Sequence, residues 1–354
     1  MSTVACWRER VLSAASAHSP LRIVGAGTKD FYGQVIAGEA FDTREHRGIV
    51  DYDPTELVVT ARCGTPLSEI ESALAAEQQI LAFEPPHFGD GATLGGCIAA
   101  GLSGPRRPYA GAVRDVVLGV RLLDGKGDEL GFGGRVMKNV AGFDVSRVLA
   151  GSLGTLGIIL DASLKCLPQP RSERTVCLDV TLDQALARFA EWSPLPLVVS
   201  GTCWHRDRMS VRLSGATSAI AAAERRIGGD VLPDAEAFWS SVREQRHAFF
   251  AEGDGALWRA SVRATAPQPL VAAPTLIEWS GALRWFRVDS IAQGHAIREW
   301  ATVHGGHATL FRGEDKSAGV FTALPGALMT VHRRLKAAFD PAGILNPGRM
   351  YAEW

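Results

Sequence analysis

The first half of the chain alternates short apolar runs, which predict strands, with segments whose apolar residues recur at helical spacing. The alanine-rich residues 4–17 suit a helix. A second helix is expected to begin with Thr65 as its N-cap, because Pro66 suits the first helical position and Glu69 the first turn. The strands expected in this half span residues 21–24, 49–51, 57–61, 80–83, 113–123 and 158–167.

From residue 173 onward, helical patterns mix with strands that need not be parallel. Thr181 and Gln184 have the spacing of a capping box, which predicts the start of a helix. The mixture predicts an α+β domain in which helices cover an antiparallel sheet. Beyond the helix after Thr181, the expected helices span residues 218–227, 235–249 and 291–303, and the expected strands span residues 197–200, 209–213, 257–263, 283–288 and 308–312.

The prolines of Pro168-Gln-Pro170 interrupt this pattern, and we expect a domain boundary there. The first domain would span residues 1–170 and the second residues 171–325. A helix at 329–339 and the tail that follows it would form a C-terminal segment at 326–354.

The composition is that of an ordinary globular protein, since 46% of the 354 residues are hydrophobic and 21% are charged. The 37 basic and 38 acidic residues give a formal net charge of −1, so there is no electrostatic reason to expect binding to nucleic acid or to an anionic membrane. No apolar run approaches the roughly 18 residues of a membrane span, and charges occupy the place where a signal peptide needs an apolar core. We expect a cytoplasmic protein.

Neither the cysteines nor the histidines form a convincing metal site. The six cysteines are scattered without a C-x-x-C pair, so we expect most of them to be small buried apolar residues. His304 and His307 have a spacing that metal ligands can use, but two further ligands are not evident. A turn between a helix and a strand explains this pair better, and no metal is expected.

Three glycine clusters carry the candidate chemistry. The stretch at 84–104 holds six glycines between Gly89 and Gly104. Such a density predicts positive φ angles or close approach of the backbone to a ligand, and N–H groups that face one point form an anion-binding nest. A buried glycine-rich turn is the alternative.

The loop Gly25-Ala-Gly27 follows an expected strand, as in a dinucleotide-binding fingerprint. Asp30, however, stands where the third glycine would be, and no helical pattern follows. A Rossmann domain is therefore not predicted, although a phosphate-binding loop remains possible. The third cluster lies at 151–157 and precedes a strand.

In this order, and with the tail at 339–351, the three clusters resemble the FAD-linked oxidases of the vanillyl-alcohol-oxidase type, which have a PCMH-type FAD-binding domain. Within that family the chain is most similar to the E-type subunits of bacterial glycolate oxidases. The resemblance implies an α+β protein with an FAD domain of two small α/β lobes and an inserted cap domain. The C-terminal tail would return to the FAD domain. The matching stretches are residues 91–96, 138–144, 151–157, 278–285 and 339–351.

The resemblance also implies which residues contact FAD. The first pyrophosphate loop would be Val24, Gly25, Ala26, Gly27 and Thr28. The second, along the pyrophosphate and the ribityl chain, would be Gly91, Ala92, Thr93, Gly95, Gly96 and Gly101. The third element would be Gly151, Gly154, Gly157 and Ile158, and the tail residue near the cofactor would be Asn346.

The chain departs from its relatives at two places. Some relatives bind FAD covalently through a histidine beside the first loop, where this chain has Thr28, so we expect non-covalent FAD. The related 2-hydroxy-acid dehydrogenases carry cap-domain histidines that bind a metal and the substrate, and these have no counterpart here. They also have a glutamate where this chain has Leu153. The catalytic residues therefore stay unassigned.

Other polar residues have both a functional and a structural interpretation. His87 could face the flavin or lie exposed in a loop. Lys138 and Asn139 could approach the flavin ring or lie in a solvated loop. Arg284 and Arg287 could hold a substrate carboxylate, although the solvent face of a strand is the commoner place.

Three more arginines, Arg106, Arg107 and Arg114, are expected at the surface or at a partner contact. The resemblance implies that the partners are a D-like FAD subunit and an F-like iron–sulfur subunit of a glycolate (2-hydroxy acid) oxidase complex. That complex would oxidise glycolate to glyoxylate, at the inner face of the bacterial membrane. The alternative is a self-sufficient FAD-dependent oxidase or dehydrogenase that acts on another small hydroxy acid or alcohol.

Overall fold

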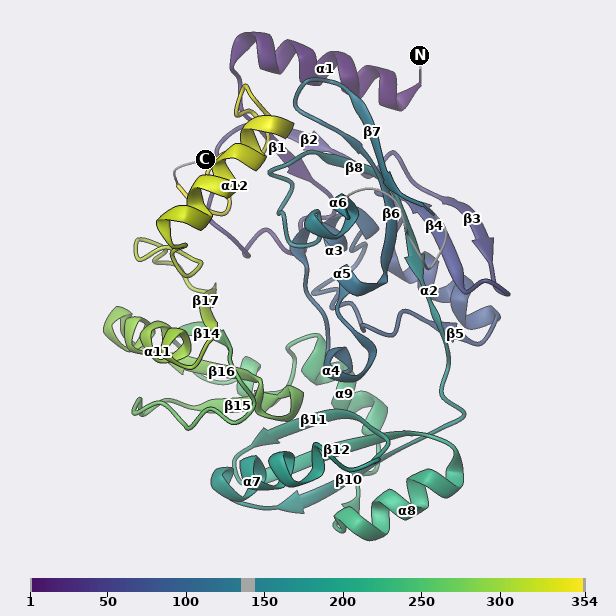
Figure 1. The fold of residues 1–354 in the computed structure, drawn as a ribbon, viewed down its shortest axis with the longest axis vertical. Helices are drawn as coiled ribbons and strands as arrows, with labels where there is room; N and C mark the ends of the chain where they lie inside the picture. The colour runs from purple at the N-terminus through teal and green to yellow at the C-terminus, as the bar shows by residue number, and fades with distance from the viewer. Residues whose placement is uncertain (1, 135–143, 353–354) are drawn as a thin grey trace. The chain divides into compact units, whose positions relative to one another are not determined.

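The computed structural model describes residues 2–134 and 144–352, and the chain divides into two compact units (Figure 1). Unit 1 contains Met1–Leu102, Ala112–Gln169 and Ala323–Trp354, and unit 2 contains Ser103–Gly111 and Pro170–Thr322. The chain leaves unit 1 twice and returns to it twice. Contacts between residues far apart in the sequence must therefore hold this unit together.

The largest sheet of unit 1 is antiparallel, in the order β3-β4-β8-β6-β7, and the parallel pair β1-β2 and the antiparallel pair β5-β9 lie outside it. The strands of unit 1 are β1 (Leu21–Val24), β2 (Glu39–Asp42), β3 (Ile49–Asp53), β4 (Val58–Arg62), β5 (Gln79–Ile80), β6 (Val117–Leu123), β7 (Glu129–Gly133), β8 (Ile158–Lys165) and β9 (Leu167–Pro168). Its helices are α1 (Thr3–Ala17), α2 (Leu67–Ala76), α3 (Leu94–Ala100), α5 (Val113–Val116), α6 (Val145–Val148) and α12 (Gly326–Phe339).

Helices α1, α2 and α3 share one hydrophobic core with the large sheet. On α2 the buried side chains are Leu67, Ile70 and Leu74, whose spacing of three and four residues places them on one face of the helix. Leu160 of β8 and Ile98 of α3 belong to the same core. Burial of this shared apolar surface is the main force that fixes the helices on the sheet.

The C-terminal tail returns to β1, which confirms the expectation drawn from the resemblance. Leu345 pairs with Leu21 in a parallel bridge. The Leu21 amide donates to the Ile344 carbonyl over 2.7 Å, and the Asn346 amide donates to the Leu21 carbonyl over 3.0 Å. In Figure 1 the yellow tail after α12 lies beside the purple β1.

Unit 2 is built on an antiparallel eight-stranded sheet in the order β13-β10-β12-β11-β15-β16-β14-β17, which confirms the expected α+β domain. Its strands are β10 (Ser172–Asp179), β11 (Val199–His205), β12 (Arg208–Gly215), β13 (Asp230–Val231), β14 (Ala256–Ser261), β15 (Thr275–Glu278), β16 (Leu283–Val288) and β17 (His307–Arg312). Its helices are α4 (Arg107–Ala110), α7 (Leu182–Trp192), α8 (Thr217–Ile227), α9 (Ala235–Arg243), α10 (Ala248–Ala251), the 3-10 helix η1 (Trp279–Gly281) and α11 (Ile291–Val303).

Two hydrophobic cores support the two halves of this sheet. Phe189 of α7 and Ile220 of α8 pack with Val211 of β12 in one core. Ile297 of α11 packs with Phe286 of β16 in the other. The capping box expected at Thr181 is confirmed, since Thr181 and Gln184 bond reciprocally at the start of α7.

The central glycine-rich stretch contains a helix that the sequence pattern does not predict. Thr93 is the N-cap of α3, and its hydroxyl accepts from the Gly96 amide over 3.3 Å. Two glycines in a seven-residue helix lower its intrinsic propensity. Tertiary packing therefore stabilises α3, because Leu94, Cys97 and Ile98 are fully buried.

Some expected elements begin or end elsewhere. Thr65 is not the N-cap of α2; Pro66 is, because the Thr65 hydroxyl bonds instead to the backbone of Gly48. The expected strand 113–123 starts with the short helix α5, where the Asp115 carboxylate accepts from the Ala112 amide over 2.8 Å. The expected helix 235–249 divides into α9 and α10, because Gln245 adopts a φ of 55°.

The expected strand 80–83 is also shorter than predicted. Only Gln79–Ile80 forms β5, because the chain turns where the Glu84 amide donates to the Leu81 carbonyl over 3.0 Å.

The segment Ser103–Gly111 belongs to unit 2, whereas the expected first domain at 1–170 would have contained it. The Trp279 indole donates to the Gly104 carbonyl over 3.1 Å, and the Tyr109 and Ser280 hydroxyls lie 2.7 Å apart. These long-range partners cannot be read from the local pattern of the segment.

Arg106 also ties this segment to unit 2, so it is not the surface residue that we expected. Its guanidinium is 2.6 Å from the Glu173 carboxylate and 3.2 Å from the Ser214 hydroxyl. Although burial alone would raise the pKa of Glu173, Arg106 and Ser214 hold it below its usual value. The carboxylate is therefore stabilised in its charged form. Of the other two arginines, Arg107 lies over the Trp279 ring, 4.4 Å from its centroid, and Arg114 is exposed.

The expectation that most cysteines are buried is confirmed for five of the six. Cys63, Cys97, Cys166, Cys177 and Cys203 are buried free thiols, as predicted, while Cys6 is exposed. Burial raises the pKa of the Cys63 and Cys97 thiols to about 12. Among residues 2–134 and 144–352, no helix has both the length and the apolar character needed to cross a bilayer.

The Arg106–Glu173 pair generates a stability prediction. Because the Glu173 side chain is 40% exposed, Arg106→Met should lower the free energy of unfolding by about 2 kcal/mol at pH 7, between the costs for buried and exposed pairs. Since the folded pKa of Glu173 is lowered, this stabilisation is present above its unfolded pKa. It should be lost as the pH falls toward about 3. Urea unfolding at both pH values measures the difference.

The matched control is Arg226→Met in the same unit, since Arg226 forms a largely exposed pair with Glu191 at 3.4 Å. It should cost less than about 0.5 kcal/mol. Equal losses for the two variants would show that Arg106 does not anchor the segment.

Candidate functional site

Unit 1 contains a cavity of about 320 Å³ where segments from four parts of the sequence meet. The loop after β1, the start of α3, the third glycine cluster and the C-terminal tail all contribute side chains or backbone to it. Its lining residues are Arg22, Ile23, Gly25, Ala26, Gly27, Thr28, Lys29, Asp30, Val35, Ile36, Thr93, Gly96, Ala99, Ala100, Leu153, Asn346 and Arg349.

The loop from Gly25 to Thr28 lines the cavity along its whole length. None of its four amide groups donates a hydrogen bond to another residue in the part of the chain that the structure describes. Gly27 has a φ of 74°, and a Cβ at Gly25 would lie 2.5 Å from the Thr93 hydroxyl oxygen. The loop thus combines unsatisfied donors with close backbone packing, which is the property of an anion-binding nest.

The second glycine cluster divides its roles between the cavity and the packing of α3. Thr93 and Gly96 line the cavity. Gly95 packs against Cys63, the residue that follows β4, since a Cβ there would lie 2.8 Å from the Cβ of Cys63. Gly101 ends α3 in the left-handed conformation, where a Cβ would lie 2.8 Å from the Gly151 Cα. Gly101 and Gly151 therefore let α3 and the third cluster approach each other.

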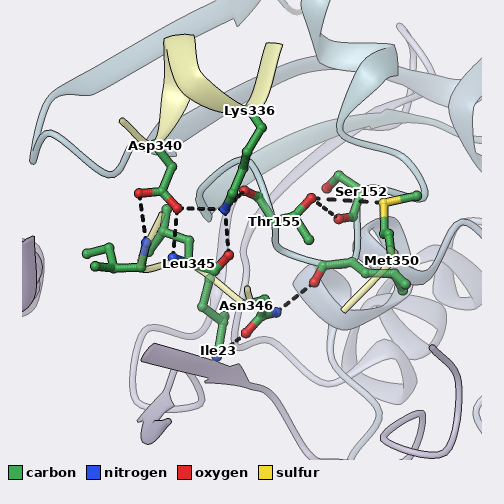
Figure 2. A network of polar contacts seen from close by, with 10 residues as sticks. Ile23, Ser152, Thr155, Lys336, Asp340, Leu345, Asn346 and Met350 are labelled. Carbon is green, nitrogen blue, oxygen red and sulfur yellow. Dashed lines mark hydrogen bonds and ion pairs between the residues drawn. The ribbon is translucent and has the colours of Figure 1, made fainter. Parts of the chain in front are cut away.

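Asn346 joins the tail to the first loop and to the third cluster (Figure 2). Its side-chain oxygen accepts from the Ile23 amide over 2.8 Å, and its side-chain NH₂ donates to the Leu153 carbonyl over 2.6 Å. A Cβ at Gly154 would lie 2.7 Å from the Asn346 side-chain nitrogen. One buried side chain therefore sets the relative positions of three cavity walls.

Charged side chains at the cavity are mostly positive. Arg22 lies 3.6 Å from Asp30, and Lys29 donates to the His87 carbonyl over 3.2 Å. Arg349 donates to the carbonyls of Gln34 and Asp30 over 2.9 and 2.8 Å, and burial lowers its pKa. Three cations against one carboxylate make this cavity attractive to an anion.

Some of the predicted site residues line the cavity and others do not. Those that line it are Gly25, Ala26, Gly27, Thr28, Thr93, Gly96 and Asn346. Those outside the lining are Val24, Gly91, Ala92, Gly95, Gly101, Gly151, Gly154, Gly157 and Ile158. Gly157 illustrates the second group, because a Cβ there would lie 2.7 Å from the Leu122 side chain.

Sequence reasoning missed the cations Arg22 and Arg349 and the alanines Ala99 and Ala100. Arg349 stands three residues after Asn346 in the tail that was already singled out, so its proximity to that residue was a usable signal. Arg22 lies on the strand that enters the first loop and gave no comparable signal.

His87 does not line the cavity; its imidazole lies 3.1 Å from the Glu71 carboxylate of α2. His304 ends α11 and His307 begins β17, which is the turn that we expected. Among the described residues no group of three or more histidine, cysteine or acidic side chains could hold a metal ion. Lys138 and Asn139 lie outside the described residues.

Arg284 is neither a carboxylate clamp nor a solvent-facing residue, so both interpretations of it are wrong. Its side chain is fully buried in unit 2 and donates to the carbonyls of Gly281, Pro267 and Ala266 and to the Gln268 amide oxygen. Burial lowers its pKa to about 10. Arg287 likewise donates to the backbone carbonyls of residues 249, 250 and 255.

The cavity fits part of a dinucleotide cofactor. Its unsatisfied amides and cations suit a pyrophosphate, and its glycines and alanines leave room for close approach. The neutral amides supply donors without the desolvation cost of additional charges.

Comparisons with known proteins match two family models to the two ends of the chain and one relative to nearly its whole length. Residues 5–133 match the family described as FAD binding domain, and residues 304–350 match the C-terminal domain of FAD linked oxidases. The chain is 46% identical over 345 residues to the glycolate oxidase subunit GlcE of Escherichia coli. This match covers 98% of this chain and 96% of that protein.

More distant relatives share the FAD-binding half or the fold. The glycolate oxidase subunit GlcD of Bacillus subtilis is 31% identical over 171 residues, or 47% of this chain and 36% of that protein. A solved structure of alkyldihydroxyacetonephosphate synthase has a TM-score of 0.65 at 16% identity, and the match covers 96% of this chain and 73% of that one. This last similarity concerns the fold alone.

The burial of Arg284 generates a prediction that separates a structural role from a substrate-binding one. Arg284→Met should lower the free energy of unfolding by about 3 kcal/mol, because it leaves several buried acceptors without donors. The exposed Arg225 of α8 provides the control variant Arg225→Met, which should change stability by less than about 0.5 kcal/mol. Urea unfolding measures both. Wild-type stability of Arg284→Met would restore the substrate-clamp interpretation.

Proposed function

The chain belongs to the FAD-linked oxidase family that includes the glycolate oxidase subunit GlcE, and we propose that it is the FAD-binding subunit of a glycolate oxidase. The observation that carries this proposal is the cavity of unit 1, in which the first loop, α3, the third cluster and the tail meet. The protein is thus an FAD-dependent oxidoreductase that works in the oxidation of glycolate to glyoxylate.

The pyrophosphate of FAD would be held by the loop from Gly25 to Thr28, whose amides have no other acceptor among the described residues. Arg22, Lys29 and Arg349 would supply positive charge around it. Thr93 and Gly96 would line the site beside this loop, and Asn346 would fix the position of the loop relative to the third cluster.

FAD binding is proposed to be non-covalent. Thr28 occupies the place at which some relatives carry a linking histidine, and the cavity lining contains no histidine among the residues that the structure describes. The backbone and side-chain contacts of this cavity would then be the whole source of affinity.

Oxidation of a 2-hydroxy acid removes a hydride from carbon 2 and a proton from the hydroxyl group. Bound FAD supplies the acceptor for the two electrons. A base must take the proton, and a cation must hold the carboxylate. The apolar Leu153 lines this cavity where related dehydrogenases have a glutamate, and the buried Arg284 is occupied by protein carbonyls.

We therefore assign the substrate chemistry to a D-like FAD subunit and the onward electron transfer to an F-like iron–sulfur subunit. The expected cytoplasmic location, at the inner face of the membrane through those partners, belongs to the same proposal. The flavin of this chain would relay electrons, serve a second, slower site or support the complex structurally.

The first test is Gly27→Asp, which should abolish FAD binding while leaving the protein folded. A carboxylate about 4 Å from a phosphate charge costs roughly 4 kcal/mol at an effective dielectric near 20, or about three decades of affinity. Titration with FAD, followed by flavin fluorescence, measures the change.

Gly319→Asp in unit 2 is the matched control, since Gly319 has a similar φ of 76° and its added Cβ would meet nothing closer than 4.0 Å. It should bind FAD with wild-type affinity. Normal affinity in Gly27→Asp would place the pyrophosphate elsewhere.

A second test concerns the division of labour. The isolated protein with FAD should be reduced by glycolate several decades more slowly than the complex with its partners, because a general base alone contributes about 10²–10⁴ in rate and orientation adds more. Stopped-flow absorbance of the flavin measures both rates. Bleaching of the isolated protein within milliseconds to seconds would favour the self-sufficient oxidase instead.

A further inference from the structure

A buried lysine in unit 1 links the third glycine cluster to the C-terminal tail, two of the segments that form the cavity. Lys336 is the one residue of α12 whose side chain is buried, at 6% exposure. Its ammonium group donates to the Thr155 carbonyl over 2.7 Å, to the Leu345 carbonyl over 2.7 Å and to the Asp340 carboxylate over 2.6 Å (Figure 2). Three acceptors match the three protons of an ammonium group.

Asp340 extends this link into the tail. Its carboxylate accepts from the Ile344 amide over 3.1 Å and from the Leu345 amide over 2.8 Å. The side chain is fully buried, so the turn after α12 is folded around it. The pair therefore fixes the residue that immediately precedes Asn346.

Leu153 of the third cluster is held in an unfavourable backbone conformation next to Asn346. Leu153 has a φ of 52° and Asn346 a φ of 43°, both in the left-handed region, which asparagine adopts readily and leucine does not. The left-handed conformation costs Leu153 of order 1–3 kcal/mol, so the surrounding structure must hold it in place. Lys336 binds carbonyls on both sides, two residues after Leu153 and one residue before Asn346.

We propose that Lys336 is a positioning residue of the cofactor site. By joining the Thr155 and Leu345 carbonyls, it holds Asn346 where its side-chain amide bridges Ile23 and Leu153. This inference rests on the proposed function, because it assumes that FAD occupies the cavity. The lysine itself does not line the cavity, so it would act on the cofactor only through Asn346.

The chemistry of the site explains why a lysine stands there. Burying an ammonium group is costly, and that burial lowers the pKa of Lys336. An apolar side chain would avoid the cost but would leave two backbone carbonyls and a carboxylate without a donor. An arginine would keep the charge, but its donors lie in one plane on three nitrogens, whereas the three acceptors here surround a single nitrogen.

The experiment is a double-mutant cycle on FAD affinity with Lys336→Met, Asn346→Ala and both together. Each single substitution should raise the Kd for FAD at least tenfold. The double variant should be weaker than the worse single variant by no more than about threefold, because both act through one contact. The Kd is measured by flavin fluorescence on protein shown to be folded by circular dichroism.

Outcomes separate a positioning role from a purely structural one. A lysine that only stabilises the fold would lower Tm and leave the Kd of the folded protein unchanged, and multiplicative effects in the double variant would also overturn the proposal. Lys126→Met is the control, because Lys126 forms a lysine–aspartate pair with Asp124 at 3.3 Å in the same unit. It should leave the Kd within twofold of the wild type.

If Lys336→Met does not fold, the variant Lys336→Arg tests the positioning role instead. It keeps the charge and should fold, with a Kd raised at least threefold; an unchanged Kd would overturn the proposal. Gly27→Asp distinguishes failure of the two proposals. If this variant retains FAD, the assumed location of the cofactor is wrong. If it loses FAD while the Lys336 variants bind FAD with wild-type affinity, only the proposed role of Lys336 is wrong.

Discussion

The return of the C-terminal tail to β1 is the constraint on which the cavity, our proposed cofactor site, depends. Ile23 and Asn346 stand at opposite ends of the chain, yet a 2.8 Å hydrogen bond joins them. The same asparagine holds the third cluster through Leu153, so the cavity exists only when all three segments are in place. Most of unit 2 lies in the sequence between the third cluster and the tail. The contacts that complete unit 1 therefore form between residues that are far apart in the sequence.

Glycine serves this constraint in two different ways. At Gly25 and Gly27 it brings the backbone close to the cavity and leaves amides unpaired. At Gly95, Gly101 and Gly157 it lets α3, the third cluster and β6 pack closely behind the cavity. Both uses produce the same glycine-rich pattern in a sequence. The pattern alone therefore cannot tell which glycines line the cavity and which pack behind it.

What the sequence could predict follows from the range of each interaction. The capping box at Thr181, the glycine clusters and the antiparallel sheet of unit 2 depend on neighbouring residues or on spacing. The roles of Lys336, Arg106 and Arg284 depend on partners that only the fold brings close. On an amphipathic helix such as α12, a lysine looks like a solvent-facing residue, and nothing in the local pattern reveals that it is buried.

Hydrogen–deuterium exchange with and without FAD tests the central claim most directly, because it locates the cofactor on the chain. The account predicts that FAD slows exchange of the amides at residues 25–28, which have no acceptor among the described residues, and protects segments near residues 93–96 and 346–349. Gly27→Asp should remove this protection. Unchanged exchange in these segments while FAD is bound would contradict the account, since the cofactor would then lie outside this cavity.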